Sequence, residues 1–463
     1  MNAYSLKRRM PVPVLKMCAV LLTADRREAI VMKKSKKATF FMICFVMVAL
    51  AFIDGILGVF LPQIKPELGI NDTQASAIFV VNLLGFCVFT SIGGHLCDKI
   101  GSRKSFFLLL GTLLLFCLAM LCAHTYARLI LLSFILYCAL AALTVTVNSF
   151  IPSCSPLPRL FHELFHLVNY GGIALSKTTA GLLIRHNVNW RFIYLIIAAI
   201  LIICLGLWHF SFFPAPVVPD TEKKPERTLP LKHIFSTAFF LYVAAVGGYL
   251  SSVTAMHNWF VNYAVISFHM NIAKASSVFS LFFIFSALGS VFLARFIKRV
   301  GEFKIVFLLS FAAFFLFLLG LLWRQTGLYL IALCGFFLSV TYPTTLVNIH
   351  TSFHLRPCFM LGLIVTAGSA INLIFTFVLG IANDVFGAHA SFYLVPLGLL
   401  VFSVSSFSFI CGRILPYPKI DSVNPIFHSA QRSFSMCTTL FKTRGLFSQP
   451  AFSSVNCLYG VTK

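Results

Sequence analysis

Apolar runs recur along this chain, separated by short polar connections. Each run is about 18 to 25 residues long, the length that crosses a bilayer as an α-helix. We therefore predict twelve membrane-spanning helices in two sets of six. The first set lies near residues 39–61, 74–96, 105–122, 127–150, 162–184 and 192–213. The second set lies near residues 237–261, 273–297, 304–322, 328–350, 358–382 and 391–411.

The spans and the stretches between them predict the domain organisation. Met32 precedes four lysines and would itself serve as a start of the chain. The linker between the two sets is rich in proline and charge, which is typical of a solvated connection. The predicted parts are a basic N-terminal segment (1–38), a six-helix bundle (39–213), the linker (214–236), a second six-helix bundle (237–411) and a basic tail (412–463).

Composition agrees with a membrane protein. Charged residues make up 11% of the chain, apolar residues 59%, and the mean hydropathy is +0.92. Soluble domains carry about 25% charged residues, so a water-soluble surface cannot be built from this sequence. The 14 cysteines are scattered without a C-x-x-C pair, which argues against a disulfide framework and a zinc ribbon.

The net charge of +23 does not indicate nucleic acid, because the basic residues lie in connections and tails and form no stripe with stacking aromatics. Anionic membrane lipids are the expected partners of these charges. Lys and Arg are concentrated after the even-numbered spans. The positive-inside rule therefore predicts an integral protein of the cell membrane, inner or plasma, with both termini in the cytoplasm.

The two halves of the chain are weakly similar when the sequence is shifted by 200 positions. The aligned pairs include Gly101 with Gly301, Lys104 with Lys304 and Asn148 with Asn348. Such a repeat predicts an all-α membrane fold of two six-helix bundles, related by a pseudo-two-fold axis along the membrane normal. Folds of this kind hold their ligand between the halves at the middle of the bilayer.

The connection between spans two and three carries the most specific motif. It reads Gly94-His95-Leu96-Cys97-Asp98-Lys99-Ile100-Gly101-Ser102-Arg103-Lys104. This stretch resembles the G-x-L-x-D-[RK]-x-G-x-[RK]-[RK] loop of major facilitator superfamily transporters. Asn189-Trp190-Arg191-Phe192 resembles that family's start of span six, and Gly380-Ile381-Ala382-Asn383-Asp384 with Gly387 resembles its end of span eleven. The resemblance covers about residues 39–411.

The resemblance implies a cytoplasmic latch that holds the inward gate shut. Its residues here are Gly94, Asp98, Lys99, Gly101, Arg103 and Lys104. The second half has Lys298 where the aspartate would be, so only the first latch is intact. The alternative is a charge cluster that only sets the topology.

Two further stretches suggest a branch of the family. Leu61-Pro62-Gln63 and Tyr342-Pro343-Thr344 are similar to the branch that includes fucose permease and other sugar porters. The acidic residue that this branch has in span four is absent, since the corresponding stretch reads Thr144-Val145-Thr146-Val147-Asn148. The mode of proton coupling is therefore open.

Two charged residues lie well inside predicted spans, away from the span ends: Asp54 in span one and Lys177 in span five. An ionised group in hydrocarbon is costly, so such residues are candidates for substrate contact or proton coupling. Gly55 and Gly58 are small enough to let another helix or a solute approach Asp54. The alternatives are a structural ion pair between Asp54 and Lys177, and a position of Asp54 near the headgroups.

Polar and aromatic side chains of the interior spans complete the candidate binding site. They are His166, Asn169, Tyr170, Asn148, His257, Asn258, Trp259, Asn262, Tyr342, Asn348 and Asn372. Such groups hydrogen-bond to a sugar-like ring and stack on it. The alternatives are an interfacial aromatic belt for Trp259 and hydrogen bonds between helices for the asparagines.

One motif points to different chemistry. His162-Glu163-Leu164-Phe165-His166 fits the H-E-x-x-H signature, in which two histidines hold zinc and the glutamate is the general base. Membrane zinc proteases take a third ligand from a later D-G segment, whereas Asp54-Gly55 lies upstream. We expect no metal, no cofactor and no enzyme activity, and an intramembrane metalloprotease is kept as an alternative.

These patterns predict a secondary active transporter that works by alternating access. The expected cargo is a small polar organic solute, sugar-like or a small organic anion, and protons are the expected coupling ion. The chain has no Walker A loop, which argues against direct drive by ATP. A receptor or scaffold on the same fold, without transport, is a further alternative.

Overall fold

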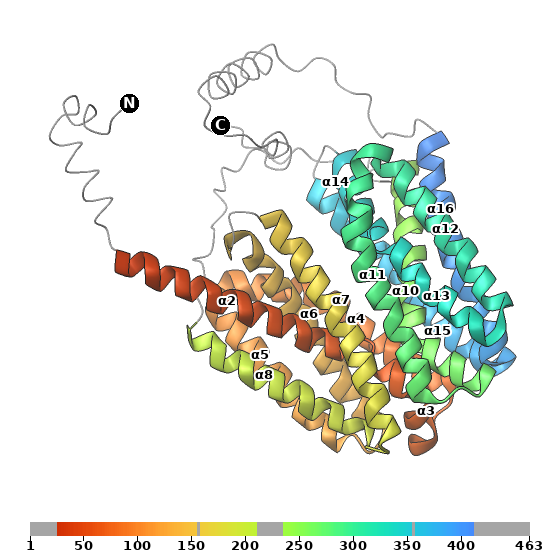
Figure 1. The fold of residues 1–463 in the computed structure, drawn as a ribbon, viewed down its shortest axis with the longest axis horizontal. Coiled ribbons are helices and arrows are strands. Elements are labelled where there is room, and N and C mark those ends of the chain that lie inside the picture. Colours follow the sequence, from red (N-terminus) through yellow and green to blue (C-terminus); the bar gives the residue numbers. More distant parts are fainter. Residues whose placement is uncertain (1–25, 155–157, 211–234, 354–356, 412–463) are drawn as a thin grey trace, which may run out of the picture. The chain divides into compact units, whose positions relative to one another are not determined.

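The computed structural model describes residues 26–154, 158–210, 235–353 and 357–411, which fold almost entirely into helices (Figure 1). Within them, ten helical stretches are long and apolar enough to cross a membrane. The last of these, Phe359–Cys411, has 53 residues. The fold is that of an all-α membrane protein.

The N-terminal half is a packed set of helices. Its elements are α2 (Arg26–Ile53), α3 (Ile56–Leu68), α4 (Asp72–Ile100), α5 (Ser102–Ala119), η2 (Met120–Cys122), α6 (Tyr126–Cys154), α7 (Pro158–Arg185), η3 (Trp190–Phe192) and α8 (Ile193–Phe210). Helix α4 packs against α6, while α2 packs against α7 and α8. Helix α5 lies against α6 and α8.

The C-terminal half repeats this kind of packing. Its elements are α10 (Thr237–Phe268), α11 (Ile272–Val300), α12 (Glu302–Leu322), α13 (Arg324–Leu338), α14 (Thr341–Ser352), α15 (Pro357–Ser391), η4 (Phe392–Leu394) and α16 (Val395–Cys411). Helix α10 packs against α15 and α16, and α11 packs against α13. Helix α12 packs against α13 and α16.

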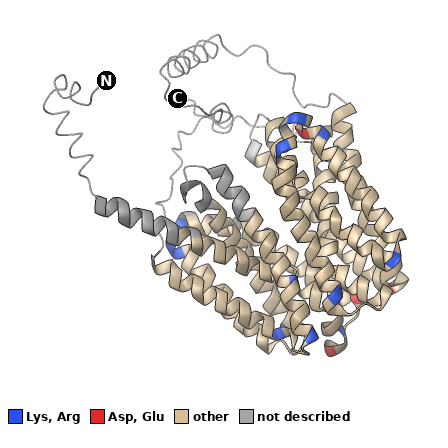
Figure 2. Cartoon of the chain, in the orientation of Figure 1, with Lys and Arg blue, Asp and Glu red and all other residues tan. Residues whose placement is uncertain are grey.

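Three helix pairs form the main contacts between the halves in the described part of the chain. Helix α7 packs against α11, α4 against α15, and α3 against α10 (Figure 1). Figure 2 shows that the Lys and Arg residues of the described part lie mostly near helix ends. Their charges can therefore remain in water while the helix interiors face lipid or other helices.

Turn residues recur at the 200-residue spacing of the sequence repeat. Gly69 and His269 both adopt a left-handed conformation, with φ of 64° and 51°. Asn71 caps the start of α4 and Asn271 caps the start of α11 through their side chains. Gly101 and Gly301 have φ of 84° and 94° where one helix ends and the next begins. The 200-residue repeat is therefore clearer in the turns than in the apolar spans.

Helix ends and interruptions differ from the predicted spans. The first span does not end near residue 61, because α3 continues through the polar residues Gln63, Lys65 and Glu67 to Leu68. Span ten is divided between α13 and α14. Span seven continues to Phe268. At the end of α3, Lys65 and Glu67 form ion pairs with Asp72 and Arg191, which a count of apolar residues does not register.

Candidate functional site

The first span is broken at its centre. Helix α2 ends at Ile53 and α3 begins at Ile56, within the candidate span Phe41–Leu68. Gly55 lies in the break with φ 63° and ψ 15°, a left-handed conformation that favours glycine. A Cβ at this position would lie 3.1 Å from the Lys177 Nζ. The break therefore places Asp54 at the middle of the span, where the Lys177 side chain lies close to the backbone.

Three side chains from neighbouring helices satisfy consecutive carbonyl groups of the break. The Ser176 hydroxyl donates to the Phe52 oxygen at 3.2 Å. The Tyr137 hydroxyl donates to the Ile53 oxygen at 3.3 Å. The Lys177 ammonium donates to the Asp54 backbone oxygen at 2.8 Å. Without such partners, backbone groups freed by a broken helix would be left unsatisfied in an apolar environment.

The Asp54 carboxylate makes its described contact with α10 of the other half. Its side chain is 47% exposed, and its Oδ1 lies 3.9 Å from the Nδ1 of His257 on α10. The described contact between Lys177 and Asp54 runs to the backbone oxygen, so it differs from the side-chain ion pair considered above. The carboxylate is thus available to other groups.

Lys177 is fully buried. Its Nζ lies 5.9 Å from the centre of the Phe279 ring on α11, a cation–π distance. The His257 ring packs edge-on against Phe279 and Phe283, at 6.1 and 4.9 Å between ring centres. One cation, one carboxylate and one histidine from both halves therefore meet near the break in the first span.

The C-terminal half adds aromatic and amide groups. Tyr342 of α14 stacks on Tyr249 of α10, with ring centres 4.9 Å apart and planes 11° apart. Asn372 of α15 donates to the Thr254 hydroxyl at 3.0 Å and accepts from Thr376 at 3.3 Å. These contacts show Asn372 joining α15 to α10, which is the helix-bridging role considered above.

Other predicted residues of this half are buried. Trp259 packs edge-on against Phe79 of α4 at 5.8 Å. Among the described residues, no hydrogen-bond partner is found for the Trp259 Nε1, for either side-chain polar atom of Asn262, or for the Asn348 Oδ1. Asn258 is also buried.

The remaining predicted site residues lie in α6 and α7. Asn148 is exposed, at the end of the candidate span Tyr126–Asn148. Asn169 and Tyr170 are half-buried on α7. The side chains of His162, Glu163 and His166 lie outside what the structure describes. The participation of His166 in the solute site stays a prediction.

The motif between the second and third spans folds as the end of α4, a glycine turn and the start of α5. The Arg103 guanidinium lies 5.0 Å from the centre of the Trp208 ring. The Trp208 Nε1 donates to the Arg103 carbonyl at 3.3 Å. Lys99 and Lys104 are exposed. The Asp98 side chain and the surroundings of Gly94 are not among the described positions, so the latch remains a prediction.

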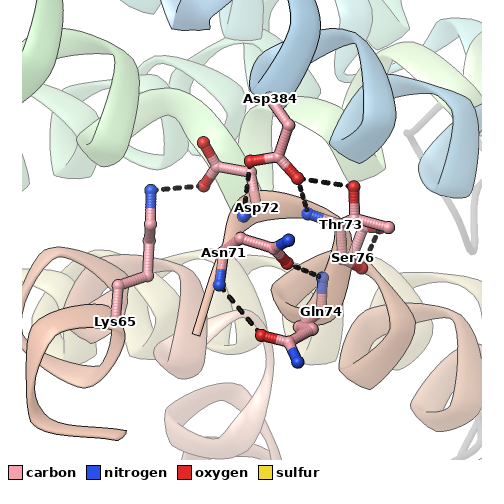
Figure 3. Close-up of polar contacts among 7 residues, drawn as sticks. All are labelled: Lys65, Asn71, Asp72, Thr73, Gln74, Ser76 and Asp384. Carbon is pink, nitrogen blue, oxygen red and sulfur yellow. Dashed lines mark hydrogen bonds and ion pairs between the residues drawn. The ribbon is translucent and has the colours of Figure 1, made fainter. Parts of the chain in front are cut away.

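A second polar cluster lies at the Gly69 end of the bundle, where α3 meets α4 (Figure 3). Asp384 of α15 accepts the backbone N–H of Asp72 at 2.9 Å through Oδ1. Its Oδ2 accepts the Thr73 N–H at 2.7 Å and the Thr73 hydroxyl at 2.5 Å. Lys65 pairs with Asp72 at 2.5 Å. A carboxylate of the C-terminal half therefore caps the first turn of α4 in the N-terminal half.

Glycines allow close contacts between the halves at the same end. A Cβ at Gly58 would lie 2.5 Å from the His257 carbonyl oxygen, and one at Gly380 would collide with Ser76. A Cβ at Gly181 would lie 3.1 Å from the Ala273 oxygen. Helix backbones approach each other closely at these three points.

The Asn189-Trp190-Arg191 motif ties together three segments of the N-terminal half. Arg191 Nη1 pairs with Glu67 at 2.6 Å, and Nη2 donates to the Ala123 carbonyl at 2.6 Å. The Trp190 Nε1 donates to the other Glu67 oxygen at 2.8 Å. The end of α3, the end of the third span and the start of the sixth are thereby held at one point.

Comparison with known proteins agrees with this arrangement. Residues 43–360 match the Major Facilitator Superfamily. The chain belongs to the major facilitator superfamily. As a member of this family it is an integral membrane protein, and the family is one of transporters, not of metalloproteases. The predicted family is confirmed.

Relatives within the superfamily are distant. A hexuronate transporter of Bacillus subtilis (strain 168) is 24% identical over 222 residues, which is 45% of this chain. The match covers 52% of that protein, so the chain spans about half the length of this relative.

Solved structures show the superfamily fold at low identity. The fucose:proton symporter of E. coli is 18% identical with a TM-score of 0.57, covering 81% of this chain and 98% of that one. A nucleoside transporter is 13% identical with a TM-score of 0.64, covering 81% and 99%. A D-xylose-proton symporter is 9% identical with a TM-score of 0.65, covering 81% and 97%. At these identities the likeness shows the fold alone.

Sequence reasoning missed several residues that hold the site. Tyr137 and Ser176 contact the break, and Tyr249 stacks on a predicted residue. Each lies in an apolar span, where a tyrosine or serine has no feature that separates it from an ordinary packing residue. Glu67 lies near a helix end, where charges are common.

Proposed function

We propose that this superfamily member moves a small organic anion of the sugar-acid type by alternating access, together with protons carried by Asp54. The cluster of Asp54, Lys177 and His257 is the observation that carries the proposal. It lies at a helix break in the middle of a span and draws on both halves of the chain. Ionisable groups at this depth are costly, which makes a role in transport their default interpretation.

Lys177 suits the carboxylate of such a solute. Its ammonium donates to a neutral carbonyl group, so its positive charge is not cancelled by that contact. A substrate carboxylate near the ammonium would gain a charge-assisted hydrogen bond. The distant relative named a hexuronate transporter supports this substrate class, because a hexuronate carries both a carboxylate and a sugar skeleton.

The predicted topology fits the proposal. Helix α7 lies at the position of predicted span five, and Phe359–Cys411, which is kinked at Gly387, is long enough for two crossings. We propose twelve spans in two six-helix bundles with pseudo-two-fold symmetry, with both termini in the cytoplasm. The turns that recur at a 200-residue spacing support the duplicated architecture.

This topology makes the Gly69 end the outer face. Asp384 capping α4, and the glycine contacts at Gly58 and Gly380, would then close the outer side. We propose that the structure represents a conformation closed to the outside. Release of these contacts would open the site outward, and the predicted latch around Asp98 would close the inner side.

Proton coupling follows from charge balance at the site. A substrate carboxylate brings a negative charge next to Asp54, and two carboxylates at one site repel each other. Protonation of Asp54 removes this repulsion, so proton and anion bind together. After proton and substrate have both been released, the empty site can return with Asp54 ionised near Lys177 and His257.

Uptake into liposomes that contain the purified protein tests the proposal. For a monoanion carried with one proton, an inward gradient of one pH unit should drive about tenfold accumulation of labelled glucuronate. Because that cycle moves no net charge, an imposed membrane potential should leave the accumulation unchanged. Asp54→Asn should abolish accumulation and retain exchange of internal for external substrate. Glu302→Gln, which alters an exposed carboxyl at the start of α12, is the matched control.

A neutral sugar is the second candidate, favoured by the stacked Tyr249–Tyr342 pair, which resembles an aromatic platform for a sugar ring. A neutral sugar carried with a proton moves charge, so its uptake would respond to membrane potential. Accumulation of labelled hexose that follows the potential would select this candidate. Absence of accumulation for both solute classes would contradict the proposed substrates.

A further inference from the structure

The Tyr137 hydroxyl spans the break in the first span. It comes from α6, accepts the Gly55 N–H at 3.3 Å and donates to the Ile53 carbonyl at 3.3 Å. These two groups belong to the residues on either side of Asp54. One hydroxyl therefore links the last residue of α2 to the left-handed glycine that starts α3.

This bridge fixes the backbone from which the Asp54 side chain projects. The Asp54 N–H still bonds to the Leu50 carbonyl at 3.0 Å, as in a helix. Gly55 turns the chain immediately afterwards, and its N–H has Tyr137 as acceptor. The direction of the carboxylate depends on this turn, because the side chain itself is bound to no group at hydrogen-bond distance among the described contacts.

We propose that Tyr137 is a positioning residue for proton coupling: by bridging Ile53 and Gly55, its hydroxyl holds the Asp54 carboxylate between His257 and the exposed space at mid-span. The inference rests on the proposed function, in which Asp54 carries the proton. Tyr137 acts through the backbone, and Asp54 alone exchanges the proton.

The surroundings of the carboxylate contain few ionisable groups. Helix α7 contributes Lys177, α10 contributes His257, and α6 contributes Tyr137 itself. Tyr194 of α8 lies near Tyr137. Helix α11 presents Phe279 and Phe283, which do not ionise. Loss of the Tyr137 hydroxyl would leave each of these groups in place and change only the support of the break.

The break has independent supports that allow Tyr137 to be tested alone. Ser176 and Lys177 still satisfy the carbonyls of Phe52 and Asp54 when the Tyr137 hydroxyl is removed. Tyr137→Phe keeps the ring and deletes both bridging bonds. Tyr126→Phe is the matched control, because Tyr126 lies on the same helix and its hydroxyl donates to the Gln74 carbonyl at 3.1 Å, away from the break.

Uptake of labelled glucuronate into liposomes provides the readout. Tyr137→Phe should lower the accumulation driven by one pH unit from about tenfold to near equality, whereas exchange without a gradient should be unchanged. A residue with only a structural role would lower both activities together. Tyr126→Phe should retain both activities. Full accumulation by Tyr137→Phe would overturn the inference.

Comparison with wild type and with Asp54→Asn separates failure of this inference from failure of the proposed function. If wild-type protein shows no proton-driven accumulation of either solute class, the proposed function fails and the inference fails with it. If wild type accumulates solute and Asp54→Asn does not, but Tyr137→Phe behaves as wild type, only the inference fails. If Tyr137→Phe cannot be purified, 3,5-difluorotyrosine at position 137 keeps the shape and weakens the hydroxyl as an acceptor. It should give intermediate accumulation, and wild-type accumulation would overturn the inference.

Discussion

Asp384 of α15 accepts both the backbone N–H and the hydroxyl of Thr73 through a single carboxylate oxygen, and so joins the end of one half to the first turn of α4 in the other. The negative charge strengthens the bond, because the first turn of a helix offers unpaired N–H groups and a partial positive charge. It is therefore suited to holding the proposed outer side shut.

Asp384→Asn should open that side more often. The substitution removes the charge and leaves one acceptor oxygen, at a cost of about 1 kcal/mol for an exposed group, which is about a fivefold shift in the population. Ser76 is buried beneath the contact. A membrane-impermeant thiol reagent should therefore label the Ser76→Cys protein about fivefold faster when Asp384→Asn is also present. Thr73→Ser keeps the hydroxyl and should leave the labelling rate unchanged. Equal rates in all three proteins would contradict the role of Asp384.

Gly55→Ala should impair transport far more than Gly69→Ala. Both glycines have positive φ, at 63° and 64°, so both substitutions meet the same backbone strain of about 1 kcal/mol. A Cβ at Gly69 meets no atom within 4 Å, whereas one at Gly55 lies 3.1 Å from the Lys177 Nζ and 3.2 Å from the His257 Nδ1. Thermal stability should fall by a similar amount in both proteins, and uptake should be lost only in Gly55→Ala. Similar uptake in the two variants would show that the site tolerates displacement of Lys177 and His257.

Gly58→Leu should prevent closure of the proposed outer side. The added side chain would collide with the backbone of α10 at His257 and Asn258. The protein should remain folded in the outward-open conformation, with uptake lost and substrate still bound from outside. Gly111→Leu is the control, because a Cβ at Gly111 meets no atom within 4 Å. Normal uptake by Gly58→Leu would show that α3 and α10 do not need to touch during transport.

Lys177→Gln should weaken the binding of a carboxylate substrate. Loss of a charge-assisted hydrogen bond costs about 1.5 to 3 kcal/mol, so the dissociation constant measured by calorimetry should rise about 10- to 100-fold. Lys274→Gln removes an exposed charge from the start of α11 and should leave affinity unchanged. Unchanged affinity in Lys177→Gln would favour a neutral substrate.

Arg191→Lys should lower stability without altering affinity. Lysine cannot reproduce the planar set of donors that reaches Glu67 and the Ala123 carbonyl together. The loss should cost about 1 to 3 kcal/mol, measured as a lower midpoint of thermal unfolding. Arg185→Lys, at the exposed end of α7, should unfold as wild type does. A changed substrate affinity in Arg191→Lys would indicate that this contact reaches the central site.

The sequence predicted the membrane helices, the repeat and the family, because each of these leaves a periodic or local pattern. It also singled out Asp54 and Lys177, because an isolated charge in an apolar run is conspicuous. The break at Gly55 left no such pattern. A glycine inside an apolar span is common, and only the positions of Tyr137, Ser176 and Lys177 on other helices show that the chain turns there.

Contacts across long sequence separations were beyond prediction for the same reason. Asp384 and Asn189-Trp190-Arg191-Phe192 were identified as motif positions, but their partners Thr73 and Glu67 depend on how the helices pack. From the sequence alone Asn372 could face a solute or join a neighbouring helix, and the structure shows its hydrogen bond to Thr254. The predicted contributions of His166 and Asp98 stay predictions.

The glycines at 58, 181 and 380 give the contact between the halves an unusual mutational profile. A conventional truncation scan searches for side chains whose removal weakens an interface, and it would pass over these positions because there is nothing to remove. Damage here would come from adding atoms, so the most harmful changes would be replacements of these glycines by larger residues.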